Sequence, residues 1–155
     1  MKQKFLWGTI LFLSMSLFIF SSCSSDDDDD NPAKPVINLT EVGSENNKTG
    51  VAGSDLHLEG SIVADGMIKQ IDVEIHQETG GSFKIEKSYK DGKYIGVKNA
   101  DFHEHIDIPA EAPAGDYHVH FTVTDQFGQA TTAESNISSP SCFLSASAFL
   151  YAVSY

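Results

Sequence analysis

The sequence predicts an all-β fold, and three observations lead to that prediction. Apolar and polar residues alternate at a period of two along residues 34–139, as in half-buried strands, and helical periodicity is absent there. Glycine and proline turns interrupt this alternation at short intervals. The 155-residue chain is 41% hydrophobic, which is enough for one modest core. We therefore expect a single β-sandwich domain over residues 34–139.

The first half of this domain is expected to contain three strands. They cover residues 35–42, 55–64 and 67–77, and a turn at Asp65-Gly66 separates the last two. Successive side chains of a strand point to opposite faces, so every second residue can reach the core. The residues that share this inward parity in the second and third strands are Leu56, Leu58, Ile62, Ile71, Val73 and Ile75.

The middle of the domain is less regular. Residues 82–88 and 94–97 are expected to form two short strands, and residues 101–108 a longer one. Glu104 shares the inward parity of the longer strand, so we expect a β-bulge or an edge position there. The other inward residues of that strand are Phe102, Ile106 and Ile108.

The last two strands are expected to form a hairpin. Residues 109–116 are a turn-rich crossing, and the strand 117–125 alternates cleanly. Its first residue, Tyr117, stands where sandwich folds place a tyrosine whose hydroxyl bonds back to the backbone. A tight turn with Gly128 in the left-handed position leads into the strand 129–137. About seven strands at this spacing predict an immunoglobulin-like sandwich.

Residues 1–22 have the features of a lipoprotein signal peptide. Two lysines precede an interrupted apolar stretch that ends in Phe20-Ser21-Ser22-Cys23. This ending resembles a bacterial lipobox, in which small residues precede a cysteine that is lipidated and becomes the new N-terminus. Its phenylalanine stands where leucine, valine or isoleucine is usual. We expect lipidation at Cys23; the alternative is an ordinary cleaved signal peptide with a chance cysteine.

Residues 23–33 are expected to form a disordered acidic tether. Five consecutive aspartates repel one another and cannot bury apolar area. Their place directly after the lipobox cysteine resembles the acidic export signal of Bacteroidetes surface lipoproteins. The resemblance implies an outer-membrane lipoprotein that faces the medium, and the alternative is one that faces the periplasm.

Residues 140–155 form an apolar tail whose role the sequence leaves open. The tail is shorter than a membrane span and lies beyond a complete sandwich. It could add a strand, cover a sheet edge or contact a partner, and an altered reading frame would also explain it. If Cys23 carries the lipid, Cys142 has no intrachain partner for a disulfide.

The charge balance excludes one class of partner. The formal net charge is −12, and all ten basic residues are lysines. Arginine makes the bidentate contacts to phosphate and guanine, and an acidic chain is repelled by phosphate backbones. We therefore expect no nucleic-acid binding.

The domain resembles a family of Bacteroidetes lipoproteins. The segments "DLHLEG", "VEIH" and "FHEHIDIPAEAPAGDYHVHFTVTD" are similar to DUF4625, a domain of unknown function. The similarity covers residues 34–139, about two-thirds of the chain. It implies an immunoglobulin-like fold and an envelope location, and it implies no activity.

Six histidines are the candidate metal ligands, and all have the parity opposite to the apolar rows. Neighbouring strands of an immunoglobulin-like sandwich would bring them together as two patches, one on each outer face. Imidazole and carboxylate suit zinc or copper ions, whereas the alternative is that the rings are simply solvated. The first patch is His57, His103 and His105, with Glu59 and Asp107 near; the second is His76, His118 and His120, with Glu74 near.

These features predict a lipid-anchored envelope protein that presents an immunoglobulin-like domain for binding or structural interaction. No nucleophile elbow or phosphate loop is present, so we expect no enzyme activity and no cofactor. The partner is expected to be a protein or a glycan, with Phe83, Tyr89 and Tyr94 as the aromatic residues that an exposed rim would use. The alternative is a zinc- or copper-binding surface lipoprotein that uses the histidine patches.

Overall fold

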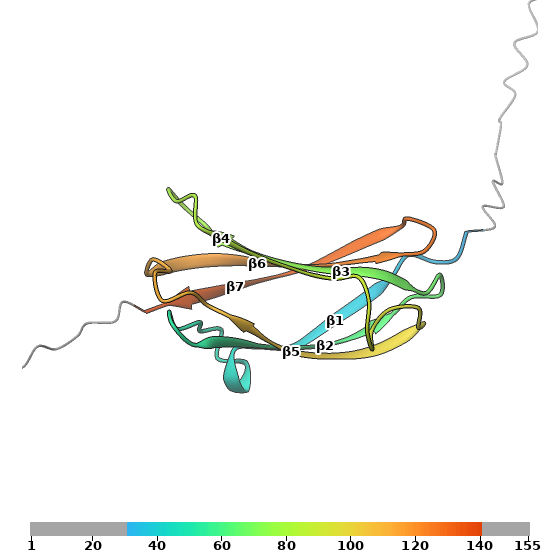
Figure 1. Ribbon diagram of the computed structural model, residues 1–155, viewed down its shortest axis with the longest axis horizontal. Coiled ribbons are helices and arrows are strands. Elements are labelled where there is room, and N and C mark those ends of the chain that lie inside the picture. Colours follow the sequence, from blue (N-terminus) through green and yellow to red (C-terminus); the bar gives the residue numbers. More distant parts are fainter. Residues whose placement is uncertain (1–30, 141–155) are drawn as a thin grey trace, which may run out of the picture.

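The computed structural model describes residues 31–140, which fold into two antiparallel β-sheets stacked face to face (Figure 1). The strand order is β1-β2-β5 in one sheet and β4-β3-β6-β7 in the other. This is an immunoglobulin-like sandwich in which the fourth strand pairs with the third, so the all-β prediction is confirmed. The elements are β1 (Val36–Val42), η1 (Ser44–Asn46), β2 (Asp55–Val63), β3 (Ile68–Gln77), β4 (Lys84–Tyr89), β5 (Asn99–Asp107), β6 (Gly115–Asp125) and β7 (Ala130–Ser139).

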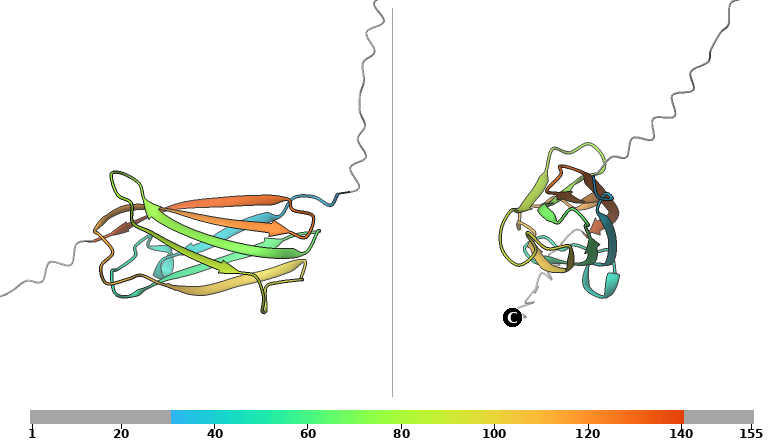
Figure 2. Two further views of the ribbon diagram at one scale, coloured as in Figure 1. Left: turned by 45° about the horizontal axis from the view of Figure 1, so that its top comes forward. Right: turned by 90° about the vertical axis from the view of Figure 1, so that its right-hand side faces the viewer.

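The core lies between the two sheets and contains the predicted inward rows. Leu56 and Ile106 come from the first sheet and Val73 and Val119 from the second, and each is at most 3% exposed. Phe102 of β5 meets Phe121 of β6 across the core, with ring centroids 4.8 Å apart at an interplanar angle of 72°. Edge-to-face aromatic contact and apolar burial therefore hold the sheets together. The elongated sandwich that results is seen from two further sides in Figure 2.

The predicted strand over residues 94–97 is wrong. Residues 93–96 form a turn, because here the chain leaves β4 in one sheet and crosses to β5 in the other. Gly92 and Gly96 take positive φ values of 85° and 76°, which breaks the extended backbone on both sides of Tyr94. This segment is apolar because the Tyr94 side chain, which is 4% exposed, packs in the core.

Glu104 occupies an edge position, as one of the two alternatives predicted. The β2–β5 register runs without a shift through the Leu58–Glu104 pair, so no bulge forms there. Because β5 is an edge strand, the Glu104 carboxylate can contact polar partners at the edge of the sheet although its parity is inward. Its Oε1 atom accepts a hydrogen bond from the Tyr94 hydroxyl at 2.7 Å and lies 3.1 Å from Lys93 Nζ.

Two local predictions about the β6–β7 hairpin are confirmed. The Tyr117 hydroxyl donates a hydrogen bond to the Pro113 carbonyl oxygen, which is the tyrosine corner expected at the start of β6. Gly128 has a φ of 83° in the hairpin turn. The buried Asp125 braces that turn by accepting a hydrogen bond from the Gln129 N–H at 2.8 Å.

The predictions for the chain termini fall on residues that the structure does not describe. These are the signal peptide, Cys23, most of the acidic tether and the apolar tail from residue 141 onward. Within residues 31–140, no helix has the length and apolar character needed to cross a membrane.

Candidate metal centre

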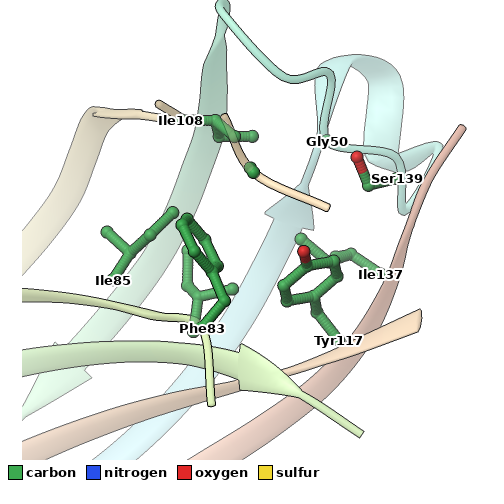
Figure 3. A pocket seen from close by; sticks show the side chains of 9 residues that line it. Gly50, Phe83, Ile85, Ile108, Tyr117, Ile137 and Ser139 are labelled. Carbon is green, nitrogen blue, oxygen red and sulfur yellow. The ribbon is translucent and has the colours of Figure 1, made fainter. Parts of the chain in front are cut away.

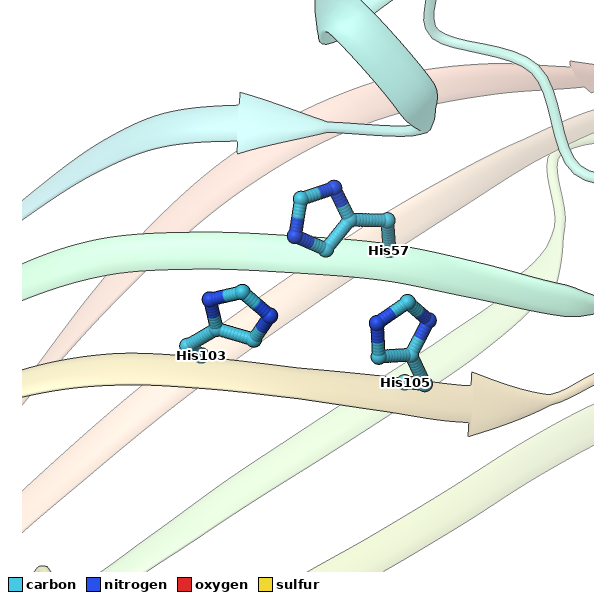
Figure 4. Close-up of side chains that lie close together, drawn as sticks. All are labelled: His57, His103 and His105. Atoms are coloured by element: carbon cyan, nitrogen blue, oxygen red, sulfur yellow. The ribbon is translucent and has the colours of Figure 1, made fainter.

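The first histidine patch forms a cluster on the outer face of the β1-β2-β5 sheet. His57 of β2 stands opposite His105 of β5, and Glu59 stands opposite His103. The His57 ring lies between its neighbours, with centroid distances of 4.9 Å to His103 and 5.0 Å to His105. Figure 4 shows the three rings gathered above β2 and β5. We call these three residues the His57 cluster.

The three rings are close enough to serve one ion. Each can offer a nitrogen such that the three nitrogens lie within 4.8 Å of one another. Donor atoms around a tetrahedral zinc ion are about 3.3 Å apart when the zinc–nitrogen bonds are about 2.0 Å long. The three nitrogens would therefore have to move closer together to coordinate one tetrahedral ion.

Glu59 supplies a carboxylate oxygen beside two of the three rings. Its Oε1 atom lies 2.8 Å from His103 Nδ1 and 3.2 Å from His57 Nε2. The His57 side chain is 18% exposed, and its Nε2 atom is buried without a hydrogen-bond partner among residues 31–140. A buried polar nitrogen without a partner carries a desolvation cost, which a bound cation would remove.

Two further carboxylates orient the rings from outside the cluster. Glu41 of β1 accepts a hydrogen bond from His57 Nδ1 at 3.0 Å, and Asp55 accepts one from His105 Nδ1. This arrangement leaves the Nε2 atoms of both rings available as ligands, because carboxylate–histidine pairs fix the tautomer of a metal-binding imidazole.

The same hydrogen bonds act on the acidity of these carboxyl groups. The hydrogen bond from His105 lowers the pKa of Asp55. Partial burial raises the pKa of Glu41, but hydrogen bonds from the Glu45 N–H and from His57 outweigh it, so the net pKa is lowered. Both groups are therefore ionised at neutral pH and add negative charge beside the cluster.

The second histidine patch also forms, on the outer face of the other sheet. His76 of β3 stands opposite His118 of β6, and His120 follows two residues later. The His76 ring is 5.5 Å from His118 and 5.1 Å from His120, measured between centroids. We call these three residues the His76 cluster.

The sequence predicted the histidine patches better than their carboxylates. Glu59 lies in the first patch as expected, whereas Asp107 stands opposite Asp55, and it is Asp55 that contacts His105. Glu74 stands opposite His120, but the carboxylates within 3.5 Å of the second patch belong to Glu78 and Glu134. Sequence reasoning missed Glu41, Asp55, Glu78 and Glu134.

The aromatic residues expected on a binding rim are turned into the domain instead. Tyr94 is a core residue, and Phe83 and Tyr89 pack partly buried against the core. Tyr89 contacts Phe102 edge to face, with centroids 5.3 Å apart. These three rings are therefore not an open stacking surface for a sugar.

A small apolar pocket opens between the sheets at the end where β7 finishes (Figure 3). Its walls are aliphatic and aromatic, and the Tyr117 hydroxyl beside it is already bonded to Pro113. Among residues 31–140, the side chains that line it include no carboxylate, imidazole or amine. The lining residues are Gly50, Ile75, Phe83, Ile85, Ile108, Ala112, Tyr117, Ile137 and Ser139.

The fold and the site together define the class of this protein: an immunoglobulin-like β-sandwich that carries an imidazole cluster on each outer face. The chain belongs to the family DUF4625, a domain of unknown function, whose model matches residues 21–138. The family recognised from the sequence segments is thereby confirmed.

Comparison with individual proteins adds no assigned activity. No curated protein matches the chain. The chain is similar to wild-type OgpA from Akkermansia muciniphila, at 15% identity and a TM-score of 0.49. The match covers 70% of this chain and 30% of OgpA. A structure of catalytically inactive OgpA with an O-glycopeptide (glycodrosocin) substrate matches with the same values.

Proposed function

We propose that this protein is a lipid-anchored, non-catalytic binding protein of the cell envelope, and that its domain binds a zinc or copper ion at the His57 cluster. One observation carries the metal assignment. The buried Nε2 atom of His57 has no hydrogen-bond partner in the described part of the chain and lies 3.2 Å from Glu59 Oε1. The three imidazoles are donors that zinc and copper accept, and the Glu59 carboxylate lies beside two of them.

The charge around the cluster supports a cation as the ligand. Glu41, Glu59 and Asp55 each lie within hydrogen-bond reach of a ring nitrogen in the cluster. The ring–carboxylate contacts of His57 and His105 also hold the imidazoles in place before an ion arrives. An anionic ligand would be repelled by the same three groups.

The position of the cluster suits a protein that is anchored at its N-terminus. Val36, the first residue of β1, pairs with Val63 at the end of β2, whereas His57 lies near the beginning of β2. The chain therefore enters the sandwich at the end opposite the His57 cluster. A lipid on Cys23 would leave the cluster on the side of the domain away from the membrane.

The metal proposal is tested by metal analysis and thermal melting of the full chain. We expect zinc or copper to co-purify, EDTA to lower the melting temperature, and added Zn²⁺ to restore it. An ion at 100 times its dissociation constant stabilises by about 2.7 kcal/mol, which shifts the melting temperature by on the order of 10 °C for a domain of this size.

His57→Ala should make the Zn²⁺ shift clearly smaller than in the wild type, and Ser61→Ala is its matched control. Ser61 lies on β2 four residues beyond His57, at the same outward parity, and belongs to neither cluster. A Zn²⁺ shift of equal size in the wild type and in His57→Ala would overturn the proposed metal site.

Lipid anchoring is tested in cells that express the full chain with its signal sequence. Labelled palmitate should be incorporated into the wild type and lost in Cys23→Ala. Protease added to intact cells should digest a surface-exposed domain and spare one that faces the periplasm. Equal labelling of the wild type and Cys23→Ala would rule out the anchor.

A further inference from the structure

We infer that the opposite sheet holds a second, separate site for a divalent transition-metal ion, between His76 and His120. The Nε2 atoms of the two rings face each other 3.0 Å apart. The rings are nearly parallel, with an interplanar angle of 10°. This site goes beyond the proposed function, because it uses other residues on the other outer face of the sandwich.

The partners of the two Nδ1 atoms indicate which ring nitrogens carry a hydrogen. His76 Nδ1 lies 3.1 Å from the backbone carbonyl oxygen of Gln77, and a carbonyl only accepts hydrogen bonds. Nδ1 of His76 therefore carries the hydrogen. His120 Nδ1 lies 3.3 Å from Glu134 Oε1, a carboxylate oxygen that favours a hydrogen on that nitrogen too.

With both hydrogens on Nδ1, the two Nε2 atoms would be bare acceptors; in the other tautomer of His120, its Nε2–H donates to His76 Nε2 and the 3.0 Å contact is a hydrogen bond. Two nitrogen lone pairs 3.0 Å apart repel each other unless a proton lies between them or a metal cation lies beside both. The arrangement of a neutral imidazole whose Nδ1–H is held by a carbonyl or carboxylate is the one that metal-binding histidines adopt. The structure thus places two imidazole Nε2 atoms close enough together to bind one ion.

The spacing of the two nitrogens fits a late first-row divalent ion. Two nitrogens bonded at about 2.0 Å are about 2.8 Å apart at neighbouring corners of a square and about 3.3 Å apart at corners of a tetrahedron. The observed 3.0 Å lies between these values. Cu²⁺ and Zn²⁺ are therefore the ions to test, and Cu²⁺ binds nitrogen donors more tightly.

The surroundings favour a cation and leave room for water ligands. Glu134 contacts His120, and Glu78 Oε1 lies 3.5 Å from His118 Nε2. The side chain of His120 is 31% exposed, so the remaining coordination positions can be filled from solvent. His118 turns toward Glu78 and is 6.2 Å from the His120 ring centroid, so it lies outside the pair.

The two sites are independent because they are on opposite outer faces. His57 belongs to the β1-β2-β5 sheet and His120 to the β4-β3-β6-β7 sheet, with the apolar core between them. The full chain should therefore bind two ions, and each site should be removable without loss of the other.

The test is a Cu²⁺ titration of the full chain by calorimetry, with electron paramagnetic resonance of the bound ion. We expect the wild type to bind two ions, and His120→Ala and His57→Ala each to bind one. The copper spectrum of His57→Ala should show coupling to two nitrogens from the remaining site. Glu134→Gln should weaken that site about 10- to 100-fold, as loss of an orienting carboxylate does.

Thr122→Ala is the matched control for the second site. Thr122 lies on β6 two residues beyond His120, and its hydroxyl contacts Thr132 instead of a ring. It should bind two ions like the wild type. Thermal melts of all variants, without metal, check that each is folded.

Different failures separate the second site from the proposed function. If His120→Ala binds as many ions as the wild type, the second site is refuted, and the bare nitrogens share a proton instead of a metal ion. If His57→Ala loses no ion but His120→Ala does, the proposed function at the first cluster fails and the second site stands. If the variant with both substitutions binds as many Cu²⁺ ions as the wild type, the copper is adventitious and both sites are refuted.

Discussion

The Tyr94 hydroxyl contacts both main-chain polar groups of His103: it accepts a hydrogen bond from the His103 N–H at 3.1 Å and lies 2.9 Å from the His103 carbonyl oxygen. Tyr94 belongs to the turn that crosses between the sheets, and its ring contacts Phe102 with centroids 4.9 Å apart. The crossing turn therefore fixes the backbone of β5 at the point where a proposed metal ligand projects from the other side of the strand.

Tyr94→Phe should weaken both the fold and the first metal site. The substitution removes the part-buried hydrogen bond of the His103 N–H, which costs about 1 kcal/mol. His103 would then be held less firmly, so Zn²⁺ should bind the His57 cluster less tightly while the His76–His120 pair is unaffected. Urea unfolding measures the first effect and calorimetric titration the second. A variant with reduced stability but unchanged Zn²⁺ affinity would show that Tyr94 has no positioning role.

Tyr89→Phe is the matched comparison, and the opposite sign is expected. The Tyr89 hydroxyl is buried and has no hydrogen-bond partner within the described residues. Removing it deletes an unsatisfied polar group while the ring keeps its contacts with Tyr94 and Phe102. The free energy of unfolding should rise by about 1 kcal/mol, as measured in urea. A loss of stability like that of Tyr94→Phe would mean that the hydroxyl has a partner after all.

Tyr89 should also make the domain sensitive to alkali. Burial, with smaller contributions from Glu104 and Tyr94, raises the pKa of Tyr89 from 10.0 to about 12. The unfolded chain releases this proton near pH 10 and the folded chain does not, so stability is complete below pH 10 and falls as the pH rises toward about 12. Tyr89→Phe should lose less stability across this interval. Melting curves of the wild type and of Tyr89→Phe, recorded at intervals of about one pH unit from about pH 9 to about pH 12, would test this prediction. Identical pH profiles of the two proteins would contradict it.

The sequence was sufficient to predict which side chains face outward, because that depends only on strand parity. The alternation of Val119 and Phe121 with His118 and His120 placed both rings on the solvent side of β6, and the sheet neighbours of an immunoglobulin-like sandwich then brought His76 to them. Parity does not give the residue-by-residue register of neighbouring strands. Glu41 and Glu134 therefore escaped prediction, because each reaches its histidine from an adjacent strand.

The error over residues 94–97 has a different physical cause. Tyr94 and Ile95 have the composition of a strand, but the chain needed this segment to pass from one sheet to the other. Tertiary position thus overrode local β-propensity, and the two flanking glycines were the available signal. The same crossing explains why Tyr94 became a core residue that binds β5.

Tyr117→Phe should lower the free energy of unfolding by about 1 kcal/mol, the usual net value of one hydrogen bond. The Tyr117 hydroxyl donates a hydrogen bond to the Pro113 carbonyl oxygen and so connects the beginning of β6 to the crossing that precedes it. Because Pro113 is exposed, water can satisfy its carbonyl after the substitution, which keeps the loss small. Urea unfolding gives the value, and the number of bound Cu²⁺ ions should stay the same. A change below a few tenths of a kcal/mol would indicate that the tyrosine corner contributes only through its ring.

Glu59→Gln should reduce the Zn²⁺ affinity of the His57 cluster on the order of 10- to 100-fold. The Glu59 Oε1 atom lies 3.2 Å from His57 Nε2 and 2.8 Å from His103 Nδ1, so the substitution removes a negative charge beside these two rings and keeps the side-chain size. Glu86→Gln is the control, because it makes the same change in net charge on the β4 strand of the other sheet. Calorimetric Zn²⁺ titrations of the two variants, each in the His120→Ala background, isolate the first site. Equal losses in Glu59→Gln and Glu86→Gln would mean that Glu59 acts only through the overall charge of the domain. A loss confined to Glu59→Gln would assign its carboxylate to the ion.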